Sequence, residues 1–146
     1  MQLVCIAKGS PSGERAAKKA AEIAKKDGYN KISLLFIVDV DFLSKSLTGY
    51  TKEENRTKEG LVHIGKTIME KLKKIILDIS PQVNIKRILR EGSTAEVIRC
   101  FVKNNTIAKL VIPKEERGPI EKTLVGGDIE SFIEELSNYT KIIIVA

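Results

Sequence analysis

The chain has 146 residues, of which 42% are hydrophobic and 30% charged, so we expect one domain over residues 1–146 with a sizeable core. No run approaches the 18 or more apolar residues of a membrane-spanning helix, and the start MQLVCIAKGS lacks the regions of a signal peptide. The formal net charge is +6 at pH 7, but lysines alternate with glutamates along amphipathic stretches, a pattern that favours solvated helix faces over a nucleic-acid surface.

The first part of the chain alternates between apolar runs and amphipathic stretches. Residues 2–7 (QLVCIA) predict a short buried strand, and the turn GSPSG leads into a helix over residues 12–26. The apolar stripe of that helix consists mainly of alanines at i, i+3 and i+4 spacing, which lets a helix lie close on a sheet. Residues 31–40 contain the continuous apolar run LLFIV, which is typical of a strand covered on both faces in a parallel sheet.

The middle of the chain adds a long helix and a charged strand. After an irregular connection from residue 39 to about residue 50, apolar residues at helical spacing predict a helix that ends at Ile79. Pro81 breaks that helix, and residues 83–89 predict a third strand. Because this strand is charged and only partly alternating, we place it at an edge of the sheet.

The last part repeats the alternation of helix and strand. Residues 92–94 (GST) open a helix with a hydroxyl cap, and residues 108–112 form a fourth strand that ends at Pro113. After a charged loop, Asp128 caps a last helix, and KIIIVA forms the final strand. Strands that alternate with helices predict a parallel α/β sheet with right-handed crossovers, here with five strands and four helices.

The stretch GLVHIGKT, which begins at Gly60, matches the phosphate-binding pattern G-x-x-x-x-G-K-T. That motif requires a buried strand before the first glycine, but the preceding residues TGYTKEENRTKE are polar and charged. Leu61 and Ile64 instead belong to the apolar stripe of the long helix, in which Gly60 and Gly65 each cost roughly 1 kcal/mol relative to alanine. We therefore interpret the match as a coincidence and His63 as a solvated residue on the polar face.

The remaining reactive residues do not form a catalytic or metal-binding pattern. The two cysteines, Cys5 and Cys100, are too few for a disulfide framework or a spaced metal site, which fits a reducing cytoplasm. Cys5 falls in the middle of the first strand and is expected to be an inert buried thiol. The sequence offers no arrangement of serine or cysteine with histidine for nucleophilic catalysis, so we expect no catalytic residues and no metal.

A ligand of an open α/β sheet binds beyond the carboxyl ends of the strands, where the strand order reverses. This rule selects the residues after the first strand, the end of the second strand and the loop after the fourth. These candidate residues are Ala7, Lys8, Gly9, Ser10, Val38, Asp39 and the loop from Pro113 to Gly127.

At these positions the chain resembles the universal stress protein family, over nearly its whole length. The similar segments are the turn at Gly9-Ser10, a second strand running into VDVD, the unit REGSTAEVIRCFVKNNTIAKLVIP, and the terminal GGDIESFIEEL and KIIIVA. The resemblance implies a Rossmann-like, three-layer α/β sandwich similar to the adenine nucleotide alpha hydrolases. Its five-stranded parallel sheet is ordered 3-2-1-4-5 with helices on both faces, and the family is usually dimeric.

ATP-binding members of that family carry G-x-x-G, nine residues, and then G followed by Ser or Thr. The same spacing here places Pro113 and Glu116 at the first two glycines, Gly126 at the third and Gly127 at the hydroxyl, while Lys8 stands where those members have an acidic residue. Proline removes an N–H donor, and glycine is what allows close backbone approach to phosphate. Two interpretations remain open: a capped helix after a charged loop, or a rebuilt nucleotide site.

The all-apolar terminal run from Ile142 to Val145 would lie at a bare sheet edge in this strand order. Such an edge indicates pairing across a two-fold axis, although a loop or helix of the same subunit could also cover it. We expect a homodimeric, non-enzymatic binding or assembly module of a stress or regulatory response, with a protein partner and no required cofactor.

The alternative is an ATP-binding switch with at most slow hydrolysis. In that case Gly126 and Gly127 would hold phosphate, Lys8 would neutralise charge and Val38 would flank the base. A third hypothesis is a basic surface that binds nucleic acid.

Overall fold

The computed structural model describes residues 2–39, 58–114 and 129–146. In these residues, strands and helices alternate along the chain. The strands are β1 (Gln2–Ile6), β2 (Lys31–Val38), β3 (Asn84–Glu91), β4 (Ile107–Pro113) and β5 (Lys141–Val145). The helices are α1 (Pro11–Asp27), α3 (Lys58–Ile79), α4 (Thr94–Asn104) and α6 (Ile129–Ser137).

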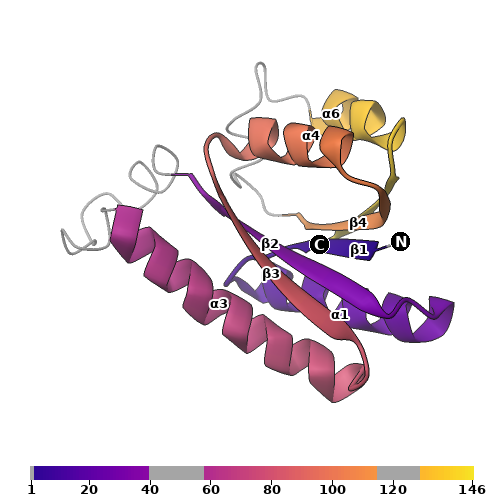
Figure 1. The fold of residues 1–146 in the computed structure, drawn as a ribbon. Helices are drawn as coiled ribbons and strands as arrows, with labels where there is room; N and C mark the ends of the chain where they lie inside the picture. The colour runs from indigo at the N-terminus through magenta and orange to yellow at the C-terminus, as the bar shows by residue number, and fades with distance from the viewer. Residues whose placement is uncertain (1, 40–57, 115–128) are drawn as a thin grey trace.

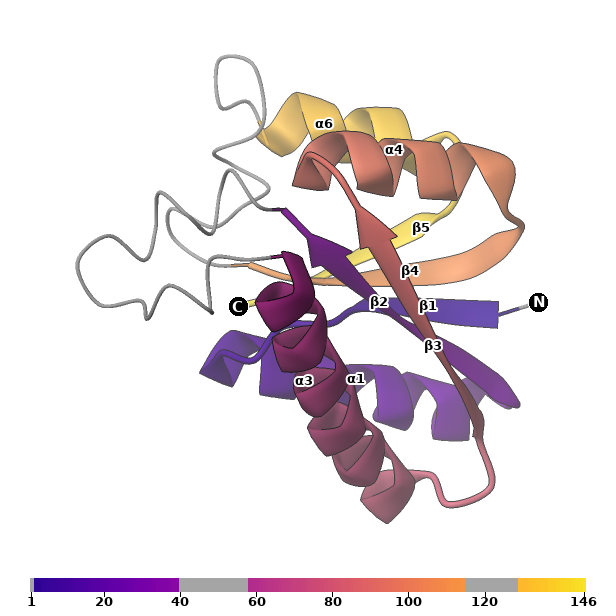
Figure 2. The same ribbon diagram turned by 60° about the vertical axis from the view of Figure 1, so that its left-hand side comes forward.

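The five strands form one parallel sheet in the order β3-β2-β1-β4-β5. Helices α1 and α3 cover one face, and α4 and α6 cover the other (Figures 1 and 2). This arrangement confirms the predicted three-layer α/β fold and its strand order, with β3 at one edge and β5 at the other. None of the helices in the described ranges is both long and apolar enough to span a membrane.

Helix α1 owes its boundaries to local chemistry and its position to alanine. Ser10 caps its start, a proline occupies the first turn, and Gly28 ends it in the left-handed conformation at φ 76°. The buried alanines of its inner face are Ala16, Ala17, Ala20, Ala21 and Ala24. Methyl side chains let the helix backbone approach the sheet, as the alanine stripe predicts.

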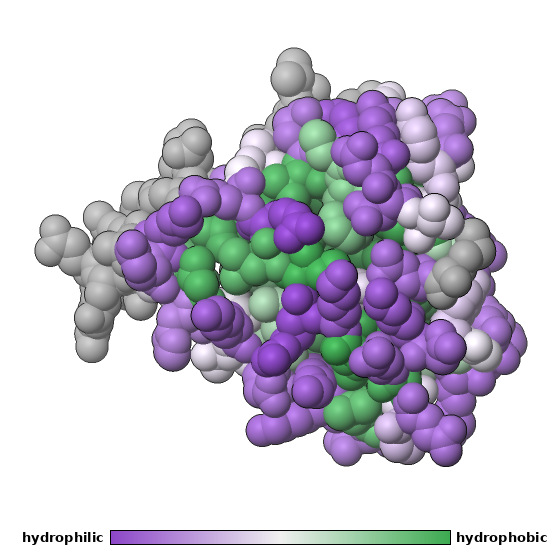
Figure 3. All heavy atoms as spheres, in the orientation of Figure 1, coloured by the Kyte–Doolittle hydropathy of each residue, from purple (hydrophilic) through white to green (hydrophobic). Residues whose placement is uncertain are grey.

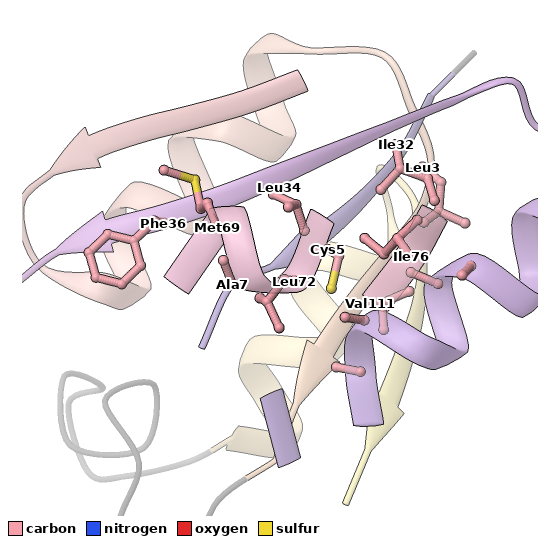
Figure 4. Packing of buried hydrophobic residues seen from close by; sticks show 14 of the residues in the cluster. Leu3, Cys5, Ala7, Ile32, Leu34, Phe36, Met69, Leu72, Ile76 and Val111 are labelled. Atoms are coloured by element: carbon pink, nitrogen blue, oxygen red, sulfur yellow. The ribbon is translucent and has the colours of Figure 1, made fainter. Parts of the chain in front are cut away.

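The core between the sheet and the α1–α3 layer contains aliphatic side chains and one aromatic ring (Figure 4). Phe36 of β2 lies beside Met69 of α3 in that view, and it is only 7% exposed. At Gly65 the helix comes so near that a Cβ atom would lie 2.5 Å from Cε1 of the Phe36 ring. Glycine at this position therefore permits a close approach of α3 to the sheet.

The opposite core joins α4 and α6 to the other face of the sheet. Ile98, Phe132 and Leu136 are buried there. Arg99 of α4 forms an ion pair with Glu135 of α6, with Nε and Oε2 2.9 Å apart, and its guanidinium lies 5.3 Å from the centre of the Phe132 ring. The arginine lowers the pKa of the Glu135 carboxyl, chiefly through their hydrogen bond.

The predicted element boundaries hold to within one or two residues where the structure describes them. The second strand ends at Val38 and not at residue 40, the third continues to Glu91, and the fourth includes Pro113. The start of the long helix, expected after residue 50, and the expected cap at Asp128 lie outside the described residues. From Lys58 onward, α3 runs to Ile79 as one helix.

Candidate functional site

The structure brings seven of the ten predicted site residues together at the carboxyl ends of the central strands, which we call the carboxyl edge of the sheet. Strand β1 lies between β2 and β4 and runs parallel to both, so the carboxyl ends of the three strands meet. The residues gathered there are Ala7, Lys8, Gly9, Ser10, Val38, Asp39 and Pro113. The other three, Glu116, Gly126 and Gly127, lie outside the described residues.

The turn after β1 is shaped by the start of α1. The Oγ atom of Ser10 accepts a hydrogen bond from the backbone N–H of Gly13 at 3.2 Å and lies 3.1 Å from Oγ of Ser12. A Cβ atom on Gly13 would overlap the carbonyl oxygen of Lys8, so this glycine permits the tight turn. Ser10, a predicted ligand-binding residue, therefore serves as the N-cap of α1.

Gly9 has a packing role in the same turn. A Cβ atom added to it would lie 3.0 Å from Cδ1 of Ile68, so α3 covers this turn from the α1–α3 side of the sheet. Gly9 itself is exposed. Gly9, one of the predicted ligand-binding residues, thus packs closely against α3.

Asp39 is the most constrained of the predicted site residues. It is 5% exposed, and its Oδ2 atom accepts hydrogen bonds from the backbone N–H of Thr94 at 2.9 Å and from Oγ1 of Thr94 at 2.7 Å. Ser93 occupies the N-cap position of α4, but its side chain makes no capping hydrogen bond. The predicted hydroxyl cap of this helix was therefore wrong, because a carboxylate 55 positions earlier takes that role.

Several backbone groups at this edge extend the sheet. The N–H of Ala7 donates to the carbonyl of Leu35 at 2.8 Å, and the carbonyl of Val38 accepts from the N–H of Gly92 at 3.1 Å. The N–H of Lys114 donates to Val145 at 2.7 Å, and Pro113 has no N–H. The N–H groups of Ala7, Gly92 and Lys114 are therefore already used, so a phosphate at the carboxyl edge would have to bind N–H groups of other residues.

Two lysines bring positive charge to the edge. Lys8 follows β1 and is half-buried, whereas Lys114 follows β4 and is exposed. At the end of β3, Glu91 forms an ion pair with Lys58, with Nζ and Oε2 2.8 Å apart, and raises the pKa of that lysine. Among the described residues, Lys8 and Lys114 are the lysines that directly follow the ends of β1 and β4.

The stretch GLVHIGKT, residues 60–67, which matches the phosphate-binding pattern, lies inside α3, as predicted. Its N–H groups belong to the helix, and the Oγ1 atom of Thr67, the predicted magnesium ligand of such a motif, donates to the carbonyl of His63 at 3.1 Å. His63 is exposed. Gly65, the second glycine of the pattern, is explained by its contact with Phe36 and not by phosphate.

The cysteines also agree with the sequence analysis. Cys5 is fully buried in β1, and burial raises the pKa of its thiol to about 12, so it is a poor nucleophile. Cys100 is exposed on α4. Within the described ranges, no three histidine, cysteine, aspartate or glutamate side chains come together in a way that could hold a metal ion.

A model of the universal stress protein family matches residues 1–137 of the chain. A comparison with curated protein sequences finds no match. Among solved structures, universal stress protein UspA from Lactobacillus plantarum is similar over 100% of this chain and 97% of its own, with a TM-score of 0.66 at 15% identity.

Two further similar structures contain a nucleotide. A universal stress protein from Archaeoglobus fulgidus in complex with dAMP is 16% identical, with a TM-score of 0.60, and the match covers 99% of this chain and 96% of that one. A universal stress protein family protein from Arabidopsis thaliana with AMP bound is 16% identical, with a TM-score of 0.61 over 100% of this chain and 92% of that one. At these identities the likeness establishes the fold.

Proposed function

Because the chain belongs to the universal stress protein family, we propose that it acts as a homodimeric, non-enzymatic binding or assembly module in a stress or regulatory response. The observation that carries this proposal is the apolar edge strand β5. The module works through protein contacts and does not require ATP.

Among the described residues, β5 pairs on one side only, with β4. Ile142 packs toward the α4–α6 core, and Ile143 and Val145 toward the α1–α3 core. Ile144 is 38% exposed and Tyr139, in the turn before the strand, is 51% exposed, and these are the exposed large hydrophobic residues of the described ranges. A bare apolar edge invites pairing with another chain, and a two-fold axis through β5 satisfies both copies at once.

The dimer is tested by size-exclusion chromatography with light scattering. The expected mass is that of two chains, and Ile144→Lys is expected to give the mass of one chain with an unchanged far-ultraviolet circular dichroism spectrum. Asn138→Lys, which adds the same charge at an exposed position just outside the strand, is the matched control and should leave the dimer intact. A monomeric wild type, or a dimer that survives Ile144→Lys, would remove the basis of this proposal.

The proposal that ATP is not required rests on the hydrogen bonds that side chains at the carboxyl edge already form with the starts of α1 and α4. Ser10 caps α1 and Asp39 caps α4, so both of these helix starts have a cap where an anion could otherwise sit. Pro113 stands at the first position where ATP-binding relatives carry glycine. An oxygen acceptor at a helix start and a missing donor at a strand end both work against a phosphate group.

A second candidate function, a nucleotide-binding switch with at most slow hydrolysis, is supported by the similar structures that contain AMP or dAMP. In this chain the base would lie beside Val38, and Lys8 would offset phosphate charge. The backbone amides of Gly126 and Gly127 would supply the donors that β1, β2 and β4 do not.

Calorimetric titration with magnesium-ATP and with AMP distinguishes the two functions, after absorbance has shown that the purified protein carries no nucleotide. No heat up to millimolar nucleotide supports the assembly module. Micromolar binding that disappears in Gly126→Asp, and persists in the charge-matched Asn30→Asp at the opposite, exposed end of the sheet, would establish the switch instead.

A further inference from the structure

The outer edge of β3 offers a row of backbone groups that pair with no other strand in the described part of the chain. There, β3 pairs with β2 alone, in parallel and over its full length. The N–H groups of Asn84 and Gly92, at the two ends of the pairing, donate to β2 or the residue before it. The backbone N–H and C=O groups of successive residues in a strand point to opposite sides within the plane of the sheet. Those of Ile85, Arg87, Leu89 and Glu91 therefore point away from β2, toward the open side of the sheet.

A groove lies at the carboxyl end of this edge, on the side of the sheet that carries α4. It has a volume of about 480 Å³ between the end of β3 and the helix, and its wall includes Val97, Cys100 and Phe101. Ile88 of β3 packs into the α4 core, so its alternation partners Lys86 and Arg90 project on the same face and flank the apolar surface. Figure 3 shows hydrophobic surface between α4 and α3, bordered and partly crossed by hydrophilic side chains.

Of the four charged residues of β3, two form ion pairs with other described residues and two do not. Arg87 is paired with Glu70 of α3 at 2.8 Å, and Glu91 with Lys58. Lys86 and Arg90 form no ion pair with any described residue; the Nη1 atom of Arg90 donates to the outward carbonyl of Leu89 at 3.1 Å. The strand thus presents two cations without an ion-pair partner among the described residues, and one of them, Arg90, occupies an outward carbonyl of the strand.

We propose that β3 binds an acidic, extended peptide segment of a partner protein, which adds to the sheet as a sixth strand. The segment pairs with the outward backbone groups of β3. On its α4-facing side, apolar side chains enter the groove and carboxylates face Lys86 and Arg90. Strand addition of this kind takes its affinity from main-chain hydrogen bonds and its specificity from side-chain pockets.

The guanidinium of Arg90 explains why the segment is acidic. A neutral strand would have to displace this side chain from the Leu89 carbonyl without offering it a better acceptor. A carboxylate can form a bidentate ion pair with the guanidinium, which a single carbonyl oxygen cannot, so it draws Arg90 away and opens the edge. Glu91 and Glu96 also line the groove, but each is already paired, with Lys58 and Arg99.

The proposal is tested by fluorescence anisotropy on the full chain, with a blocked, fluorescein-labelled nine-residue peptide that carries threonine at its even positions and glutamate and valine in turn at its odd positions. The odd positions share one face of an extended strand, so this peptide can place both kinds of side chain on the α4 side. The same peptide with lysine in place of glutamate is the charge control. A third peptide carries proline at two adjacent central positions, which removes one N–H donor from each of its edges. We expect the glutamate peptide to bind at least tenfold more tightly than either control.

Variants of the protein locate the site. Lys86→Glu is expected to weaken binding of the glutamate peptide by roughly two- to fivefold, as for one exposed charge contact. Lys74→Glu, an equal charge change on the exposed face of α3, should alter it less than twofold. Binding should shift the backbone amide resonances of Ile85, Arg87 and Leu89 in nuclear magnetic resonance spectra.

Three outcomes would overturn the proposal. Equal binding of the proline peptide would exclude strand addition. Amide shifts confined to β5 would assign the binding to the other edge. Competition by a heparin fragment at equal charge concentration, with equal loss in Lys86→Glu and Lys74→Glu, would show a diffuse response to polyanions instead.

Discussion

Replacing Gly65 with alanine sets two effects of opposite sign against each other in the middle of α3. Alanine is the better helix former, by about 1 kcal/mol in a helix interior. The new methyl group, however, would lie 2.5 Å from Cε1 and 3.0 Å from Cγ of Phe36. Carbon atoms in van der Waals contact are about 3.5–4.0 Å apart, so the ring or the helix must move by roughly 1 Å.

The steric cost is the larger of the two. Overpacking a core by one methyl group costs typically about 1–3 kcal/mol. Because the ring is only 7% exposed and is held between β2 and α3, we expect a cost in the upper part of that range, about 2–3 kcal/mol. After the gain in helix propensity, Gly65→Ala should lower the free energy of unfolding by about 1–2 kcal/mol.

Urea unfolding followed by circular dichroism at 222 nm measures this change, at one protein concentration because a dimer is stabilised by mass action. Lys66→Ala, at an exposed neighbouring position, should stay within about 0.5 kcal/mol of the wild type. In a Phe36→Leu background, Gly65→Ala should lose its cost or become stabilising, since the clashing ring is gone. If Gly65→Ala instead stabilises the wild type by about 1 kcal/mol, the close contact between α3 and β2 does not exist.

Three further predictions follow from contacts described above. Asp39→Ala, which removes the cap of α4 and leaves a buried donor without its acceptor, should cost about 1–3 kcal/mol in the same urea assay. An aromatic disulfide reagent should modify Cys100 rapidly in the native protein and Cys5 only after unfolding, as counted by released thiolate absorbance, whereas two rapid thiols would contradict the burial of β1. The carboxyl of Glu135 has a lowered pKa in the folded state, so its contribution to stability is present above its unfolded pKa of about 4.3 and is lost as the pH falls through the lower folded value. Stability measured from pH 6 to pH 3 should therefore fall less steeply in Arg99→Gln than in the wild type.

The fold was predictable because each element depends on local pattern. The run LLFIV indicated a strand buried on both faces, and the alanine stripe indicated a helix that lies close to the sheet, and both are observed. Strand order was not available from these patterns and came from the family resemblance. The charge of β3 correctly placed it at an edge, because unpaired edges of natural sheets tend to carry charge.

The candidate site was predictable in position and less so in detail. Parallel strands bring their carboxyl ends together whatever their side chains, so the rule for open sheets correctly placed Ala7, Val38 and Asp39 at the same end of the sheet. The partner of Asp39 could not be deduced, because Thr94 is distant in the sequence and Ser93 looks like the natural cap. Gly13 and Gly65 were equally hidden, since a close approach between elements leaves no periodic signal in either one.

Because the Asp39 carboxylate caps α4, a ligand at the carboxyl edge would compete with the start of that helix for it. A ligand that claims this carboxylate must take it from the start of α4, and losing a helix cap costs about 0.5–2 kcal/mol, which weakens that ligand by roughly 2- to 30-fold. A partner that binds α4 more tightly in its capped position weakens the ligand further, and by reciprocity the ligand weakens that partner by the same factor. Since α4 is also the wall of the groove beside β3, such a partner in the groove and a ligand at the carboxyl ends of the strands would be coupled through one buried carboxylate.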